Sequence, residues 1–119
     1  MKFYLNKQTG VVATICHGEI NDPAFRELKA NDTDAALEKH VPVVAVNGDT
    51  VKVDVGAVPH PMTEEHLIAG VYLQTTNGFQ EVRLFPNQPP KAEFKLASGE
   101  KPVAVYEFCN LHGLWVTKL

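Results

Sequence analysis

The sequence predicts an all-β protein, an antiparallel β-sandwich preceded by a small N-terminal β segment. Short apolar runs recur along most of the chain and are separated by turns that contain glycine, proline or asparagine. Val51, Val53 and Val55 alternate with polar residues, which is the period of a strand buried on one face. The chain has 119 residues, so it can bury the core of one sandwich with a small appendage.

The N-terminal segment predicts two short strands. Phe3–Leu5 and Gly10–Cys16 are apolar, and the polar residues Asn6–Thr9 form the turn between them. Asn21–Pro23 marks the next turn. We expect Cys16 to be a half-buried strand residue, because a free cysteine behaves as a small hydrophobic side chain.

Residues 31–40 predict a short helical turn. Asp32 or Thr33 can cap its start, and Pro42 prevents its continuation. The run Val41–Val46 that follows is almost continuously apolar, which predicts a strand covered on both faces.

Further strands follow at regular spacing. Asn47–Asp49 contains Asn-Gly, a preferred hairpin dipeptide, and Pro86–Pro90 is a proline-rich loop. This spacing of strands and turns is typical of an antiparallel sandwich. The remaining strands expected are Gly70–Thr76 and Phe79–Phe85 around the turn Asn77–Gly78, then Ala92–Ala97, Pro102–Phe108 and Leu114–Lys118.

Composition argues against several classes of partner. The 11 basic and 14 acidic residues are interspersed and give a net charge of -3, so no nucleic-acid surface or polybasic membrane patch is expected. Met1–Asn6 does not resemble a secretory signal, and no apolar run approaches the roughly 20 residues of a membrane helix. We therefore expect a cytoplasmic protein. In that reducing compartment Cys16 and Cys109 should form free thiols or a metal thiolate rather than a disulfide.

The candidate metal ligands are one cysteine and four histidines. Cys109 and His112 are spaced so that a thiolate and an imidazole can reach one ion from a single turn. His40, His60 and His66 lie in two other segments rich in proline and charge. Any one of these histidines alone would more often be a structural residue, but the set taken together favours a metal site.

The mixture of donors narrows the choice of metal. Four imidazoles and one thiolate exceed the four ligands of a structural zinc site. A blue-copper site needs a weak axial thioether, and nothing favours Met62 in that role. Five such ligands suit a square pyramid with one open position, and the mixture fits iron well. Zinc, nickel or another ion remains an alternative, because the affinity order does not favour iron.

Three motifs resemble the iron-binding segments of superoxide reductases, the desulfoferrodoxin and neelaredoxin family. They occur in the family's order between Asn31 and Trp115, and read TDAALEKHVPVV, VPHPMTEEHLI and CNLHGLW. The resemblance implies an immunoglobulin-like sandwich and one mononuclear iron site. It also implies a ligand set with the imidazoles in a plane and Cys109 axial, opposite the open position. The four planar ligands would be His40, His60, His66 and His112.

The resemblance also implies an activity. Superoxide would take one electron from Fe(II) and two protons to become hydrogen peroxide, and rubredoxin or a similar small redox protein would return the electron. Lys39 matches the family's lysine that guides superoxide and helps to protonate the product. Glu38 matches the glutamate that binds the oxidised iron at rest. The backbone N–H groups of Leu111 and His112 are the expected donors to the Cys109 sulfur, and we expect a homodimer.

Residues 1–30 resemble a desulforedoxin-like domain that has lost its metal, ahead of a catalytic domain at 31–119. Many relatives hold a second iron there with four cysteines, but this chain has Asn6, Thr9 and Ile20–Asn21 at those positions. No iron centre is expected in this segment, so the donor would reduce the catalytic iron directly. Gly70 replaces a tryptophan common in the family, which leaves the local packing in question.

Two other functions remain open from the sequence. The same metal site could serve an electron-transfer protein without superoxide chemistry. Alternatively, the sandwich could be a metal-free interaction module in which the histidines are incidental.

Overall fold

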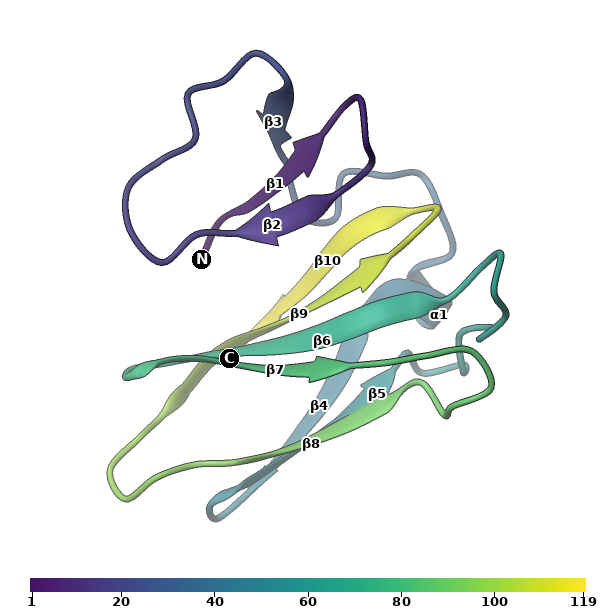
Figure 1. The fold of residues 1–119 in the computed structure, drawn as a ribbon. Coiled ribbons are helices and arrows are strands. Elements are labelled where there is room, and N and C mark those ends of the chain that lie inside the picture. Colours follow the sequence, from purple (N-terminus) through teal and green to yellow (C-terminus); the bar gives the residue numbers. More distant parts are fainter.

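The computed structural model describes all residues 1–119 as ten strands and one helical turn (Figure 1). The strands form three antiparallel sheets, which confirms the predicted all-β class. The one helix has four residues, and no helix is long and apolar enough to cross a membrane. The elements are β1 (Phe3–Asn6), β2 (Val12–Thr14), β3 (Phe25–Glu27), α1 (Leu37–His40), β4 (Pro42–Asn47), β5 (Thr50–Val55), β6 (Ile68–Thr75), β7 (Gly78–Arg83), β8 (Lys91–Lys95), β9 (Pro102–Cys109) and β10 (Gly113–Lys118).

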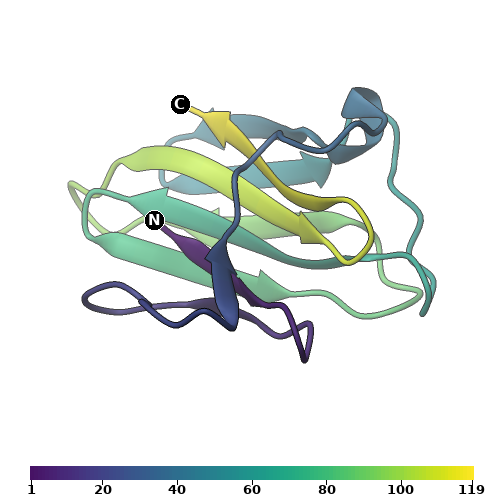
Figure 2. The same cartoon turned by 90° about the horizontal axis from the view of Figure 1, so that it is seen from above.

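Two of the sheets pack face to face as the expected immunoglobulin-like sandwich (Figure 2). One sheet has the order β4-β5-β8 and the other β10-β9-β6-β7. Val51, Val53 and Val55 of β5 are buried, as their alternation predicts, and form one apolar cluster with side chains of β6 and β9 such as Leu73 and Val105. This core fixes the ends of the strands from which the candidate ligands project.

The third sheet, with the order β2-β1-β3, lies on the outer face of the four-stranded sheet. Its anchor is Phe3, which is 1% exposed and whose ring lies 5.1 Å from that of Tyr72 and 5.2 Å from that of Tyr106. Strand β3 was not among the predicted strands, because its three residues contain only one apolar side chain. It forms by pairing with β1.

Three local predictions were wrong. Strand β4 is not covered on both faces, because it is the edge of its sheet, and Val43 and Val46 are exposed. Helix α1 is shorter than expected and begins after Ala36 with no side-chain cap, so neither Asp32 nor Thr33 caps it. Cys16 is exposed and lies outside the strands, because β2 already ends at Thr14.

Gly70 makes room for a neighbouring tyrosine. A Cβ atom at Gly70 would lie 2.7 Å from the hydroxyl oxygen of Tyr72 on the same strand. The Tyr72 ring, which also contacts Phe3, therefore occupies the space beside Gly70. A large side chain at position 70 would displace this ring.

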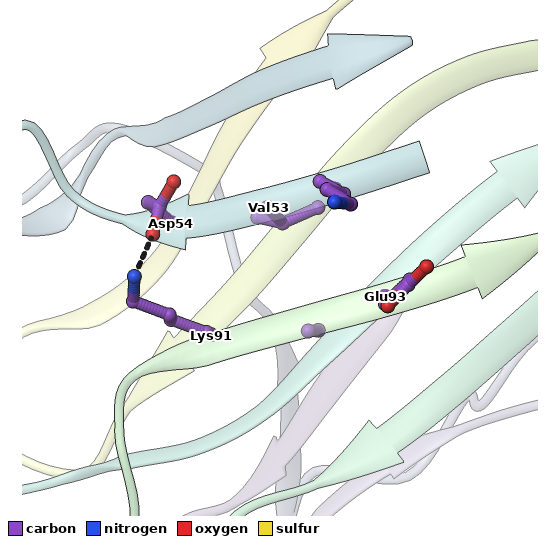
Figure 3. Close-up of a pocket in the computed structure, with 6 residues that line it drawn as sticks. Val53, Asp54, Lys91 and Glu93 are labelled. Carbon is purple, nitrogen blue, oxygen red and sulfur yellow. Dashed lines mark ion pairs between the residues drawn. The ribbon is translucent and has the colours of Figure 1, made fainter. Parts of the chain in front are cut away.

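The outer face of strands β5 and β8 carries charged side chains (Figure 3). A hollow there is lined by residues of β5 and β8, and the Lys91 ammonium lies 3.2 Å from the Asp54 carboxylate. Charges of opposite sign alternate across the two strands, as on many solvent-facing sheets. No candidate ligand lies on this face.

Candidate metal centre

Three connections meet at one end of the sandwich, and they carry all five candidate ligands. His40 ends α1, His60 and His66 lie in the connection between β5 and β6, and Cys109 and His112 flank the turn between β9 and β10. In Figure 1, α1 and the β9–β10 turn lie at the same end of the strands. The fold thus brings together residues that are up to 72 positions apart in the chain.

Local backbone features place these connections. Gly113 has a φ of 80°, so it permits the tight turn in which it pairs with Cys109. Gly56 lies directly under α1: a Cβ atom there would be 2.7 Å from the Glu38 carbonyl oxygen and 3.0 Å from that of Val41. The Val58 N–H also donates to the Glu38 carbonyl, with a distance of 2.8 Å. The backbone of α1 is therefore held closely by the chain that follows β5.

The four imidazoles form a closed circuit. The ring centroids of His40 and His60 are 4.7 Å apart, and those of His60 and His66 are 4.5 Å apart. His112 closes the circuit at 5.1 Å from His66 and 5.0 Å from His40. Neighbouring rings are close to perpendicular, so their nitrogens can point to a common centre.

Hydrogen bonds on the outer ring nitrogens orient two of these imidazoles. The Nδ1 atom of His40 lies 2.7 Å from the Ala36 carbonyl oxygen, and that of His60 lies 2.7 Å from the Pro61 carbonyl oxygen. A neutral imidazole that donates from Nδ1 keeps its Nε2 lone pair free for a metal. His66 presents a buried Nε2 with no hydrogen-bond partner, and His112 presents Nδ1, 3.2 Å from the His40 Nε2.

Cys109 lies at the floor of the site and is completely buried. Its Sγ atom is 3.5 Å from the His60 Nε2 and 3.9 Å from the His112 Nδ1. The His112 N–H donates to this sulfur at 3.4 Å. Burial raises the pKa of the Cys109 thiol, and the backbone N–H groups of His112 and Leu111 partly offset that rise.

The donor set fits one transition-metal ion. The five donor atoms all lie within 4.8 Å of one another. Metal–nitrogen and metal–sulfur bonds of roughly 2.0–2.3 Å span such a group. The unpartnered Nε2 of His66 is a further sign, because a buried polar atom normally has a partner. The sulfur of Met62 is engaged elsewhere and accepts the Ile68 N–H at 3.4 Å.

Three of the site histidines have lowered pKa values, which favours their neutral form. Burial lowers the pKa of His60 to about 4, and it also lowers the pKa values of His40 and His66. A metal binds the neutral imidazole, so protons compete weakly for these three donors near neutral pH.

A cavity of about 350 Å³ opens on the imidazole circuit. All four circuit histidines line it, whereas Cys109 does not, so the cavity and the sulfur lie on different sides of the circuit. Lys39 also lines the cavity, and its charge adds to the lowering of the His66 pKa that burial causes. Glu38 is exposed and is not part of the lining.

Two residues support the site in ways that sequence reasoning missed. Trp115 is buried in the core, as predicted, but its ring also stacks on His40 at 4.9 Å, and its Nε1–H donates to the His112 carbonyl. The Asn110 side chain bonds to the backbone on both sides of His66. Their place inside the motif CNLHGLW indicated that they lie near the site, but the motif does not show which residues they contact.

Comparison with known proteins identifies relatives over the whole chain. Residues 32–118 match the family model described as desulfoferrodoxin. A desulfoferrodoxin from Clostridium acetobutylicum is 37% identical over 121 residues, covering 97% of this chain and 94% of the relative.

Solved structures agree with these relatives. The crystal structure of the superoxide reductase from Treponema pallidum superimposes with a TM-score of 0.82 at 38% identity, over 98% of both chains. A superoxide reductase from Giardia intestinalis gives a TM-score of 0.59 at 33% identity, over 69% of this chain and 97% of its own.

Proposed function

This chain belongs to the desulfoferrodoxin family, and from that premise we propose that it is a superoxide reductase, an enzyme that reduces superoxide to hydrogen peroxide. One observation of the structure carries the proposal: four imidazoles and one thiol sulfur converge beneath a cavity that the sulfur does not line. A small anion in that cavity meets the imidazole side of the centre. The solved relatives from Treponema pallidum and Giardia intestinalis bear the same functional name.

We assign the ligand set to the five converging residues, which are His40, His60, His66, Cys109 and His112. When bound there, iron supplies the single electron that superoxide needs. Cys109 would hold the iron from the side that does not line the cavity, and its thiolate would favour electron donation by the iron, as thiolates do in haem proteins. The N–H groups of Leu111 and His112 moderate that donation.

Lys39 is the residue we assign to substrate capture. It lines the cavity and makes no ion pair in the structure, so its charge is available to an incoming anion. The protein as a whole is acidic, which makes this local cation more important for steering superoxide. We also assign to its ammonium group the transfer of protons from solvent to the product.

Glu38 is the residue we assign to closing the cavity in the oxidised protein. The Glu38 backbone is bonded to Val58 and packed on Gly56, so the required movement belongs to its side chain. Its exposed position leaves that side chain free to rotate. With the carboxylate over the cavity, other anions would be kept from the centre.

The electron must come from outside the chain, and we propose rubredoxin or a similar small redox protein as the donor. The residues at 1–30 include a single cysteine, Cys16, which is exposed and too few for a four-thiolate iron centre. We therefore treat 1–30 as a metal-free N-terminal domain and 31–119 as the catalytic domain. The family match to residues 32–118 supports this division. We further propose a cytoplasmic homodimer, whose mass sedimentation would measure.

Product stoichiometry tests the proposed reaction. The protein loaded with Fe(II) is mixed with superoxide, and the hydrogen peroxide formed and the oxygen released are counted. One peroxide for each superoxide, without oxygen, is the expected result. Release of oxygen, with one peroxide for every two superoxide ions, would show dismutation instead. If bound iron gave no acceleration, electron transfer without superoxide chemistry would replace the proposal.

A further inference from the structure

The side chain of Asn110 joins two of the loops that form the metal centre. Its Nδ2–H donates to the Glu65 carbonyl at 2.9 Å, and its Oδ1 accepts the Leu67 N–H at 2.9 Å. The Asn110 backbone N–H donates to the Leu67 carbonyl at 3.2 Å. One residue in the β9–β10 turn thus binds the backbone immediately before and after His66.

The ring of His66 lacks the support that the rings of His40 and His60 have. The outer ring nitrogens of His40 and His60 are each bonded to a backbone carbonyl, which fixes the ring. The His66 ring has no hydrogen bond, and its Nε2 is buried without a partner. Its backbone bonds to Thr63, but Thr63 belongs to the same connection and cannot fix that connection relative to Cys109.

The bonds of Asn110 are unusual for an asparagine in a turn. Asparagine in a turn commonly bonds to its own backbone two residues on. Here the partners of the side chain lie 45 and 43 residues away in the sequence. Both partners lie outside the turn between Cys109 and Gly113, on the loop that carries His66.

We propose that Asn110 is a positioning residue that holds His66 against the Cys109–His112 turn and so completes the metal centre. The inference rests on the proposed iron site. Residues that orient metal ligands commonly change metal affinity by about 10–100-fold when they are substituted.

A double-mutant cycle on the full-length protein tests this inference. Fe(II) affinity is measured without oxygen for the wild type, Asn110→Ala, His66→Ala and the double variant. We expect Asn110→Ala to weaken Fe(II) binding by about 10–100-fold. The same substitution should have little effect once His66 is absent, because the residue through which it acts is gone. Equal loss in both backgrounds would overturn the proposal, as would unchanged affinity in Asn110→Ala.

Asn31→Ala is the matched control. The Asn31 side chain also makes one bond of each kind to the backbone. Its Nδ2–H donates to the Val116 carbonyl at 3.2 Å, and its Oδ1 accepts the Val116 N–H at 2.9 Å. Its φ of 61° disfavours alanine, so this control should lose at least as much stability. We expect its Fe(II) affinity to equal that of the wild type.

The absorption spectrum of the iron-loaded protein gives a second readout, which a loss of stability alone does not change. The charge-transfer band from the Cys109 thiolate to Fe(III) should shift in Asn110→Ala and stay unchanged in Asn31→Ala. If Asn110→Ala fails to fold, Asn110→Asp keeps the acceptor for Leu67 and loses only the donor to Glu65. The part of its charge that acts directly on the iron is present in both backgrounds and cancels in the cycle.

The outcomes separate this inference from the proposed function. A wild type that binds no Fe(II) would overturn both. A wild type that binds Fe(II) and reduces superoxide, with Asn110→Ala unchanged in affinity and spectrum, would overturn the inference alone.

Discussion

Lys39 places a positive charge at the cavity of an acidic protein. We predict that Lys39→Ala reacts with superoxide at least about tenfold more slowly, because steering by a local charge raises association rates by about 10–1,000-fold. The iron content should not change, because Lys39 is not among the five donors. Stopped-flow or pulse-radiolysis rates at rising salt concentration provide the measurement.

Lys52→Ala is the control for this change in charge. Lys52 is exposed on β5 and lines the hollow between β5 and β8. The control should retain the wild-type rate and its salt dependence. A Lys39→Ala rate equal to that of this control would contradict the assigned role.

Glu107 is a completely buried carboxyl group, and neither of its oxygens has a hydrogen-bond partner. Burial raises its pKa well above the ordinary value. The folded state therefore keeps a proton that the unfolded state releases above about pH 4.3. The contribution of Glu107 to stability falls as the pH rises from there toward the raised pKa of the folded state. We predict that Glu107→Gln is more stable than the wild type near neutral pH, with an advantage that shrinks as the solution is acidified.

Urea unfolding of the metal-loaded proteins at several pH values measures this effect. Each unit of pKa displacement is worth about 1.4 kcal/mol. Glu93→Gln, on the exposed face of β8, should show no comparable trend. A difference between wild type and Glu107→Gln that did not vary with pH would mean that the carboxyl group is not responsible.

At the residue scale, the sequence predicted the candidate metal ligands better than the residues that orient them. Cys109 and the four histidines could be found because few other roles need those residue types together. The part played by Asn110 could not be found, because it depends on bonds to a loop more than 40 residues away. The carbonyls of Ala36 and Pro61 carry no side-chain signature at all.

Helix α1 is held in place by contact with a glycine. A Cβ atom at Gly56 would overlap the backbone at Glu38 and Lys39, which cannot move aside cheaply. We predict that Gly56→Ala lowers stability by about 1–3 kcal/mol, as overpacking does. It should also slow the superoxide reaction, because both residues assigned to capture and closure move with the helix. Unfolding midpoints and superoxide rates give the measurement.

Gly70→Ala is the control for that substitution. Its Cβ atom would also meet an atom at 2.7 Å, but that atom is the Tyr72 hydroxyl at the end of a side chain. We expect a smaller loss of stability and no change in rate. If the two alanine variants behaved alike, contact with α1 would have no special importance.

At the element scale, the pattern of apolar residues predicted which segments are strands, but not which strands pair with one another. The valines of β4 show high strand propensity, yet only pairing decides that β4 is an edge. Strand β3 is too short for a periodic signal and exists because β1 offers it a partner. Helix α1 has only four residues, so helix propensity could not predict where it begins.

For the whole molecule, the testable point is whether the N-terminal sheet is a separate unit. Phe3 packs between Tyr72 and Tyr106 and is the main anchor. We predict that Phe3→Ala loses about 3–5 kcal/mol of packing. The N-terminal sheet should then open locally while the metal site stays intact. Proteolysis should cut first within 1–30, with unchanged iron content.

Phe85→Ala is the matched control, because Phe85 is 58% exposed and anchors no sheet. Its proteolysis pattern should equal that of the wild type. Loss of iron together with early cleavage in Phe3→Ala would show that the chain behaves as one unit.

The sandwich as a whole followed from its strands and turns, whereas the placement of the N-terminal sheet did not. Period-2 patterns identify one buried face for each strand. The outer face of the four-stranded sheet is also covered, and this depends on the aromatic contacts of Phe3. Such a contact joins positions about 70 and 100 residues apart, and no local pattern reports it.

Three connections meet at one end of the sandwich, so a bound metal ion would stabilise the fold as well as take part in the reaction. His40 leads into one sheet and Cys109 ends a strand of the other, so a bound ion ties the two layers together at their open rim. The tie closes loops as long as 72 residues, and long loops gain most from being closed. An enzyme that lost its ion would loosen at that rim. Loss of the ion would then end the activity and also make the protein easier for proteases to cut.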